Sequence, residues 1–112
     1  MNNIEIFRNA EFGEIRTITI DGDPWLVGKD VADILGYTNA PKAIRDHVDN
    51  EDKLTERIVI SGQNRKVILI NESGFYSLVL SSKMDDAKKF KHWVTSDVLP
   101  SIRKHGAYMT SQ

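Results

Sequence analysis

The sequence predicts a small α+β domain in which an antiparallel β-meander and a β-hairpin pack with about four helices. Three observations lead to this prediction. Short runs rich in β-branched residues alternate apolar and polar positions near the start of the chain and again over residues 54–70. The segments between and after these runs repeat apolar residues with helical spacing. At 112 residues and 40% hydrophobic content, the chain is large enough for one domain with a buried core.

The first quarter of the chain predicts three short strands. Residues 4–7 and 15–20 alternate in the manner of strands, with a turn at Glu11–Glu14 between them. Asp21–Pro24 predicts a tight turn, because Asp and Gly accept positive φ and Pro presets the next dihedral angle. Trp25–Val27 then returns as the third strand. These segments together predict an antiparallel meander.

Two short helices follow. Helical spacing begins at Gly28, and Gly36 is placed to end that helix as a C-terminal cap. Asn39 is a suitable N-cap for a second helix that runs to Val48, and Pro41 fits its first turn. The two helices and their turn are a candidate helix-turn-helix, a motif that places its second helix in the DNA major groove. The same pattern also occurs in folds that bind no nucleic acid.

A β-hairpin is predicted next. Residues 54–60 and 66–70 read as its strands, and Ser61–Arg65 as a five-residue loop. Asn64, Arg65 and Lys66 would then lie at the tip, where basic side chains could reach a DNA backbone like a wing. An ordinary hairpin with a polar tip explains the same residues.

The last third of the chain predicts two helices. Asn71 or Ser73 caps the first, and the second begins near Asp85. Pro100 should kink or interrupt the second helix, because proline lacks the N–H that bonds the preceding turn. Gly106 is expected to end it. The predicted domain therefore covers residues 1–106, and residues 107–112 begin a linker or tail.

Charge is unevenly distributed along the chain. The net charge is −1, but residues 1–36 carry three basic against seven acidic residues, whereas residues 83–112 carry six against three. Such a chain can present a basic face to phosphate while staying nearly neutral overall. The polar and basic residues that we expect to contact DNA are Asn39, Lys42, Arg45, Arg65, Lys66, Lys88 and Lys91.

Other classes of protein find little support in the sequence. There is no Gly-rich phosphate loop, His-Glu-x-x-His or Gly-x-Ser-x-Gly motif, so we expect neither an enzyme nor a metal or cofactor. The chain has no cysteine, which excludes disulfides. It also has no apolar run near the roughly 20 residues of a membrane span and no secretory signal at its start. We therefore expect a cytoplasmic protein.

Four segments stand out in order along the chain: Trp25–Tyr37, Ala43–Val48, Ile70–Tyr76 and Ala87–Gly106. Together they resemble the N-terminal domain of the BRO family, found in phage and prophage antirepressors and in large DNA viruses. The resemblance implies the DNA-binding module of an antirepressor-type transcription regulator, acting on double-stranded DNA in the cytoplasm of a bacterial host cell. A separate C-terminal domain follows the module in phage antirepressors.

A protein-interaction module is the alternative. In this interpretation the domain binds a phage repressor or self-associates without contacting DNA, through an apolar patch around Trp93 and Tyr108. Trp93 is also well placed simply to pack in the core. The candidate helix-turn-helix is also compatible with a homodimer, because many helix-turn-helix proteins dimerise to read paired half-sites.

Overall fold

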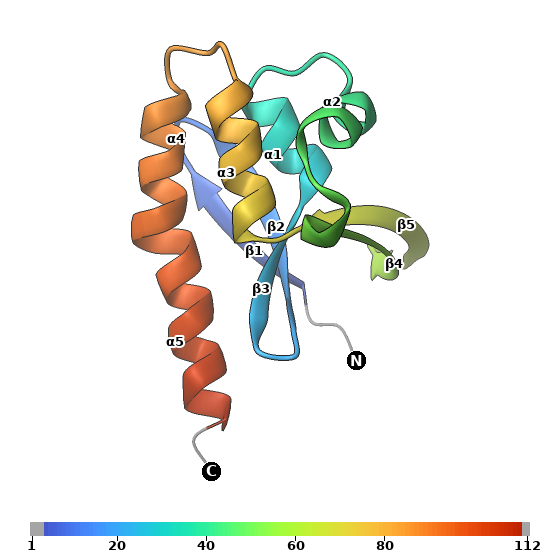
Figure 1. Cartoon of the computed structure of the whole chain (residues 1–112). Helices are drawn as coiled ribbons and strands as arrows, with labels where there is room; N and C mark the ends of the chain where they lie inside the picture. Colours follow the sequence, from blue (N-terminus) through green and yellow to red (C-terminus); the bar gives the residue numbers. More distant parts are fainter. Residues whose placement is uncertain (1–3, 111–112) are drawn as a thin grey trace.

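The computed structural model describes residues 4–110, and their side chains as far as Lys104. One antiparallel sheet carries the helices on one face (Figure 1). Its strand order is β1-β2-β3-β5-β4, with β1 (Ile4–Asn9), β2 (Gly13–Ile20), β3 (Asp23–Val27), β4 (Lys53–Ile60) and β5 (Gln63–Ile70). The predicted α+β class is confirmed.

The helices fall into two groups along the chain. Between β3 and β4 lie α1 (Gly28–Ile34), α2 (Ala40–His47) and the single 3₁₀ turn η1 (Asn50–Asp52). After β5 come α3 (Glu72–Ser81) and a long C-terminal helix. That helix consists of α4 (Ala87–Trp93), the π-helical turn η2 (Val94–Val98) and α5 (Leu99–Thr110).

The predicted meander and hairpin are parts of a single sheet. They join where Leu26 of β3 pairs with Ile70 of β5, and Val27 with Leu69. The pairing of β2 with β3 ends at Thr17 and Leu26, so the next N–H of β2 on this side has no partner on β3. That N–H, of Arg16, donates to the Asp30 carboxylate of α1 at 3.0 Å. The first turn of α1 therefore takes the place of a continued β3.

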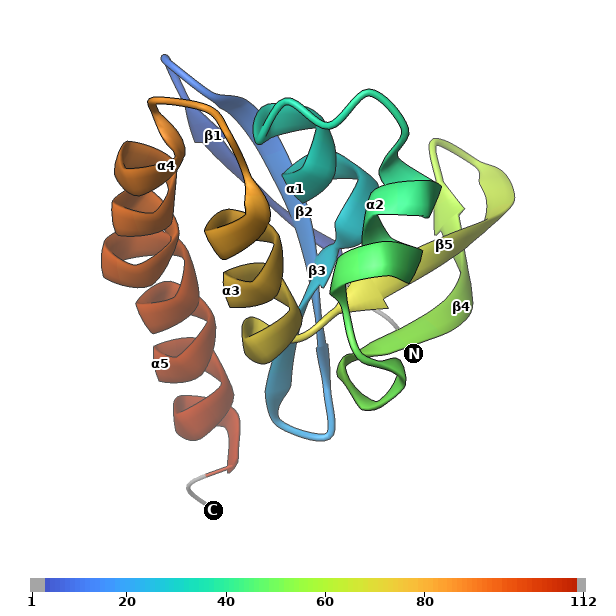
Figure 2. The same ribbon diagram turned by 45° about the horizontal axis from the view of Figure 1, so that its top comes forward.

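Apolar residues are buried on both faces of the sheet. Phe75 and Phe90 are the largest fully buried side chains between the sheet and the helices. On the other face Ile18, Val27 and Leu69 are buried together with Ile58 of the hairpin. The β4–β5 hairpin curls, as Figures 1 and 2 show, and brings this face onto the strands of the meander. The hairpin is thus anchored by its own small core.

The turn between β4 and β5 corrects the predicted five-residue loop Ser61–Arg65. Ile60 pairs directly with Gln63, which leaves only Ser61 and Gly62 in the turn. Both turn residues have positive φ, 52° and 79°, as in the type I′ turn that matches the twist of paired strands. Polar side chains at the exposed end of a hairpin need no burial, so they continue the strand. The residues predicted at the tip therefore lie within β5: Asn64, Arg65 and Lys66.

The C-terminal helix changes form just before Pro100, as the missing proline N–H predicts. Over η2 the hydrogen bonds span one more residue, and the Leu99 N–H donates to the Val94 carbonyl. The predicted end of the helix at Gly106 is wrong, because α5 continues to Thr110. A helix can run through glycine at a cost of about 1 kcal/mol. The predicted boundary after Gly106 stays a prediction, and residues 111–112 lie outside the described residues.

Candidate nucleic-acid interface

The connection from α1 to α2 closes as the sequence predicts. Gly36 has φ +86°, and its N–H donates to the Asp33 carbonyl at 3.1 Å. The next N–H, of Tyr37, reaches back to the Ala32 carbonyl at 3.0 Å. These two bonds form a Schellman motif, which satisfies the last carbonyls of α1. The Asn39 side chain then caps α2, accepting from the Lys42 N–H at 3.1 Å.

Two glycines determine how α2 sits against its neighbours. A Cβ at Gly28 would lie 2.6 Å from the Ile44 Cδ1 atom, so α1 and α2 are in direct contact there. A Cβ at Gly74 of α3 would lie 3.0 Å from Val48, the residue that follows α2. Ile44 and Val48 are both buried. They hold the inner side of α2 and leave its outer side exposed.

The outer side of α2 carries two predicted DNA-binding cations in different states. The Lys42 ammonium pairs with the Asp46 carboxylate at 2.7 Å. The hydrogen bond from Lys42 lowers the pKa of Asp46, with Arg45 and His47 adding smaller electrostatic contributions. Arg45 is exposed and forms no ion pair within residues 4–104. Of these two cations, Arg45 is the one available to a phosphate.

The hairpin brings two further cations face to face. Arg57 of β4 pairs directly with Lys66 of β5, and both side chains are exposed. Strand alternation places them on the sheet face of Ile68, which packs into the helix-facing core. Like charges directly opposite each other destabilise a strand pair. Folding alone does not favour this arrangement. Arg57 was missed in the sequence because its partner becomes clear only with the two-residue turn.

Arg65 points to the other face of the hairpin. It pairs with Ile58 in the register, and its guanidinium donates to the Gln63 Oε1 at 2.6 Å. Arg65 and Lys66 line a groove together with Arg16 and Lys29. This groove therefore gathers four cations from three elements.

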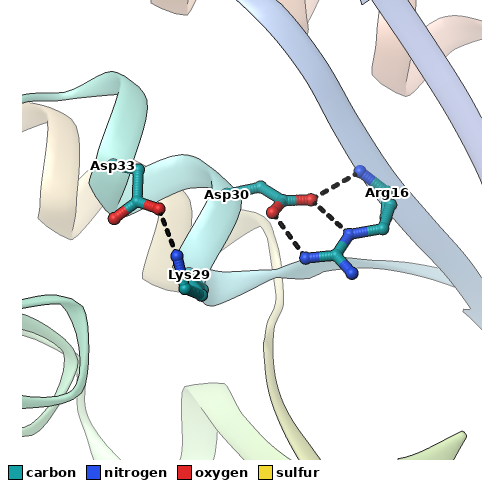
Figure 3. A network of polar contacts seen from close by, with 4 residues as sticks. All are labelled: Arg16, Lys29, Asp30 and Asp33. Carbon is teal, nitrogen blue, oxygen red and sulfur yellow. Dashed lines mark hydrogen bonds and ion pairs between the residues drawn. The ribbon is translucent and has the colours of Figure 1, made fainter. Parts of the chain in front are cut away.

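Two of those four cations are already neutralised, as Figure 3 shows. The Arg16 guanidinium donates two hydrogen bonds to Asp30, at 2.8 Å and 2.7 Å. The same carboxylate raises the pKa of Arg16, chiefly through this hydrogen bonding. Lys29 pairs with Asp33 at 2.6 Å. The Arg16–Asp30 contact is half-buried and ties α1 to β2, which is a structural role.

The two lysines predicted on the later helix lie elsewhere. Lys88 and Lys91 are exposed on α4, whereas α2 and the hairpin lie on the opposite side of the molecule in Figures 1 and 2. The Lys91 ammonium sits 5.9 Å from the centre of the Tyr76 ring, a cation–π contact. The seven predicted residues therefore do not form one surface. Five lie on α2 and the hairpin, and two on α4.

The predicted apolar patch is not present at Trp93. This side chain is 9% exposed and stacks on Phe12, with ring centres 6.2 Å apart. The Trp93 ring also packs against Phe90, with ring centres 6.1 Å apart. Trp93 therefore joins the core, and the Tyr108 side chain lies outside the described residues.

Two further features are absent from the described residues. No group of three or more His, Asp or Glu side chains is placed to hold a metal ion in that part of the chain. No helix there is long and apolar enough to cross a membrane.

Comparison with known proteins places the chain in a family. The model of the BRO family, N-terminal domain, matches residues 14–100. An uncharacterized protein of Haemophilus influenzae is 38% identical over 87 residues, which covers 78% of this chain and 43% of the relative. A putative Bro-N domain-containing protein, 289L of Invertebrate iridescent virus 6, is 36% identical over 84% of this chain and 27% of its own length.

A third relative extends the same result. The uncharacterized Bro-N domain-containing protein L2 of Acanthamoeba polyphaga mimivirus is 33% identical, over 96% of this chain and 49% of the relative. The chain thus spans between about a quarter and a half of the length of these relatives. No solved structure matches it. Because the family model covers most of the sheet and helices described above, the chain belongs to the BRO family and carries its N-terminal domain.

Proposed function

We propose that this domain binds duplex DNA as the DNA-binding module of an antirepressor-type transcription regulator. The contact surface is formed by Arg45 of α2 with Arg57 and Lys66 of the hairpin, called here the α2–hairpin surface. Asn39 and Lys42 lie beside it at the start of α2. The observation that carries the proposal is the Arg57–Lys66 pair, two like charges placed opposite each other where folding gains nothing.

The shape of the surface suits a duplex. The eight residues of α2 form a helix about 12 Å long, comparable to the width of the major groove. The hairpin lies on the same side of the molecule in both views, where its cations can follow the backbone (Figures 1 and 2). Arginine and lysine at such positions set register and affinity. The side-chain oxygen of Asn39, Oδ1, already accepts the capping hydrogen bond of α2. Recognition of a base by this residue would therefore depend on its side-chain NH₂ group.

Fluorescence anisotropy with a labelled random-sequence duplex tests the proposal. We expect the chain to bind at low salt, and Arg45→Ala and the double variant Arg57→Ala/Lys66→Ala to weaken binding and flatten its salt dependence. Arg8→Ala is the matched control, because it removes one exposed cation from β1. Binding that survives both α2–hairpin variants would refute this surface. A loss confined to Lys88→Ala/Lys91→Ala would place the DNA contact on α4 instead.

A further inference from the structure

Exposed apolar side chains gather in a groove between α3 and α4. Leu80, near the end of α3, is 85% exposed, the largest value among the exposed large hydrophobic residues of the described chain. Met84, in the connection to α4, is 38% exposed. A single exposed leucine is ordinary, but exposed apolar side chains that line one groove indicate a candidate binding surface. The groove is lined by Tyr76, Val79, Leu80, Met84, Asp85, Ala87, Lys88 and Lys91.

The groove is formed before any partner arrives. The Ser82 hydroxyl donates to the Leu35 carbonyl at 2.9 Å and accepts from the Met84 N–H at 3.1 Å. The Ala87 N–H donates to the Met84 carbonyl at 3.2 Å. The Met84 side chain also rests against Gly36, where a Cβ would come within 3.0 Å of it. Because these contacts fix the connection between α3 and α4, binding of a partner would cost little entropy for ordering this surface.

The charges on the groove restrict what can occupy it. Lys88 and Lys91, three residues apart on α4, form no ion pair within residues 4–104, and Asp85 is the one carboxylate in the lining. A second copy placed symmetrically on this groove would bring lysines toward lysines. The apolar floor offers no hydrogen bond to a phosphate or a base edge. An occupant with an apolar side and acidic neighbours fits both features.

We propose that the α3–α4 groove binds an amphipathic helix of another protein. Its apolar side packs on Leu80, Val79 and Met84, and carboxylates along one flank meet Lys88 and Lys91. Helices in grooves bind through apolar residues at helical spacing, with charges that set orientation. The groove shares no residue with the α2–hairpin surface. A domain bound to DNA through that surface could therefore hold a protein partner at the same time.

Heteronuclear NMR of the ¹⁵N-labelled chain tests this with defined probes. One synthetic helical peptide carries leucines along one side and glutamates on one flank, and a second has lysine in place of each glutamate. We expect the acidic peptide to shift the amide resonances of the groove and to bind at least about ten-fold tighter than the basic one. Leu80→Ser should weaken binding of the acidic peptide about ten-fold. Ile6→Ser, at a residue 45% exposed on β1, is the matched control.

The charge preference has its own variant. Lys88→Glu/Lys91→Glu should reverse the order of the two peptides. Equal binding of both peptides, or shifts elsewhere on the molecule, would overturn the proposal. A dimer in sedimentation that Leu80→Ser dissolves would assign the groove to a second copy, and groove shifts on adding duplex would assign it to DNA. Leu80→Ser should leave DNA affinity unchanged, so the result does not depend on the proposed DNA binding.

Discussion

Removing the Asp46 carboxylate should strengthen DNA binding, the opposite of the usual effect of an interface mutation. Asp46 holds the Lys42 ammonium at 2.7 Å on the outer side of α2. Both side chains are well exposed, so the pair contributes little to folding. Asp46→Asn removes a negative charge next to Arg45 and frees Lys42 for a phosphate. The variant therefore adds one available cation to the α2–hairpin surface.

The size of the effect follows from the number of available cations. Arg45, Arg57 and Lys66 form no ion pair in the described part of the chain. Three phosphate contacts give a log–log salt slope of about −2.7, and a fourth from Lys42 makes it about −3.6. Between about 50 and about 200 mM salt, the unchanged chain should lose about 40-fold in affinity and the Asp46→Asn variant about 150-fold.

Anisotropy titrations across that salt range measure both slopes. Glu14→Gln is the matched control, because it also removes one carboxylate and frees Arg8 from a 2.7 Å ion pair. That pair joins β1 and β2, away from the α2–hairpin surface. Unchanged affinity and slope in Asp46→Asn, or the same gain in Glu14→Gln, would refute the assignment of Lys42 to the DNA surface.

Three further predictions concern stability and pH. Gly28→Ala should lower the free energy of unfolding in urea by about 1–3 kcal/mol. Adding Ile44→Val, which removes the clashing methyl group, should recover part of that loss. Additive effects of the two substitutions would contradict the clash. Asp30→Asn, which leaves the half-buried Arg16 without its anion, should cost about 1–3 kcal/mol, and an unchanged unfolding midpoint would contradict it. Burial raises the pKa of Tyr37 above its ordinary 10.0, so an absorbance titration should show this phenol ionising at higher pH than a free tyrosine. The free energy of unfolding should therefore fall as the pH rises past 10.0, because the folded state favours the neutral phenol. Tyr37→Phe should remove that fall.

Local signals predicted the elements well. The caps at Asn39 and Asn71, the helix end at Gly36 and the interruption before Pro100 all depend on a few neighbouring residues. Such features have a local physical cause, so the sequence contains the information. The predicted loop Ser61–Arg65 was wrong because its local signal is ambiguous: polar residues are compatible with both a loop and an exposed strand end.

Long-range arrangement was harder to predict. The joining of β3 to β5 depends on two residue pairs between segments more than 40 residues apart in sequence. No local sequence pattern predicts this pairing. The same limit applies to the site. Lys42 and Arg45 were predicted together, yet only coordinates show that one is paired with a carboxylate and the other is not. Arg57 is an ordinary strand residue until the register places it opposite Lys66.

The two glycines beside α2 connect the fold to the proposed function. Gly28 of α1 lies directly against Ile44 of α2, and a Cβ at this glycine would come within 2.6 Å of the Ile44 Cδ1 atom. Gly74 of α3 receives Val48 in the same way. Arg45 lies between these two anchored residues, so it projects from a helix that is held at both points. A cation on a rigid element loses little entropy when it meets a phosphate. We therefore expect an alanine at either glycine to reduce DNA affinity even in the fraction of molecules that stays folded.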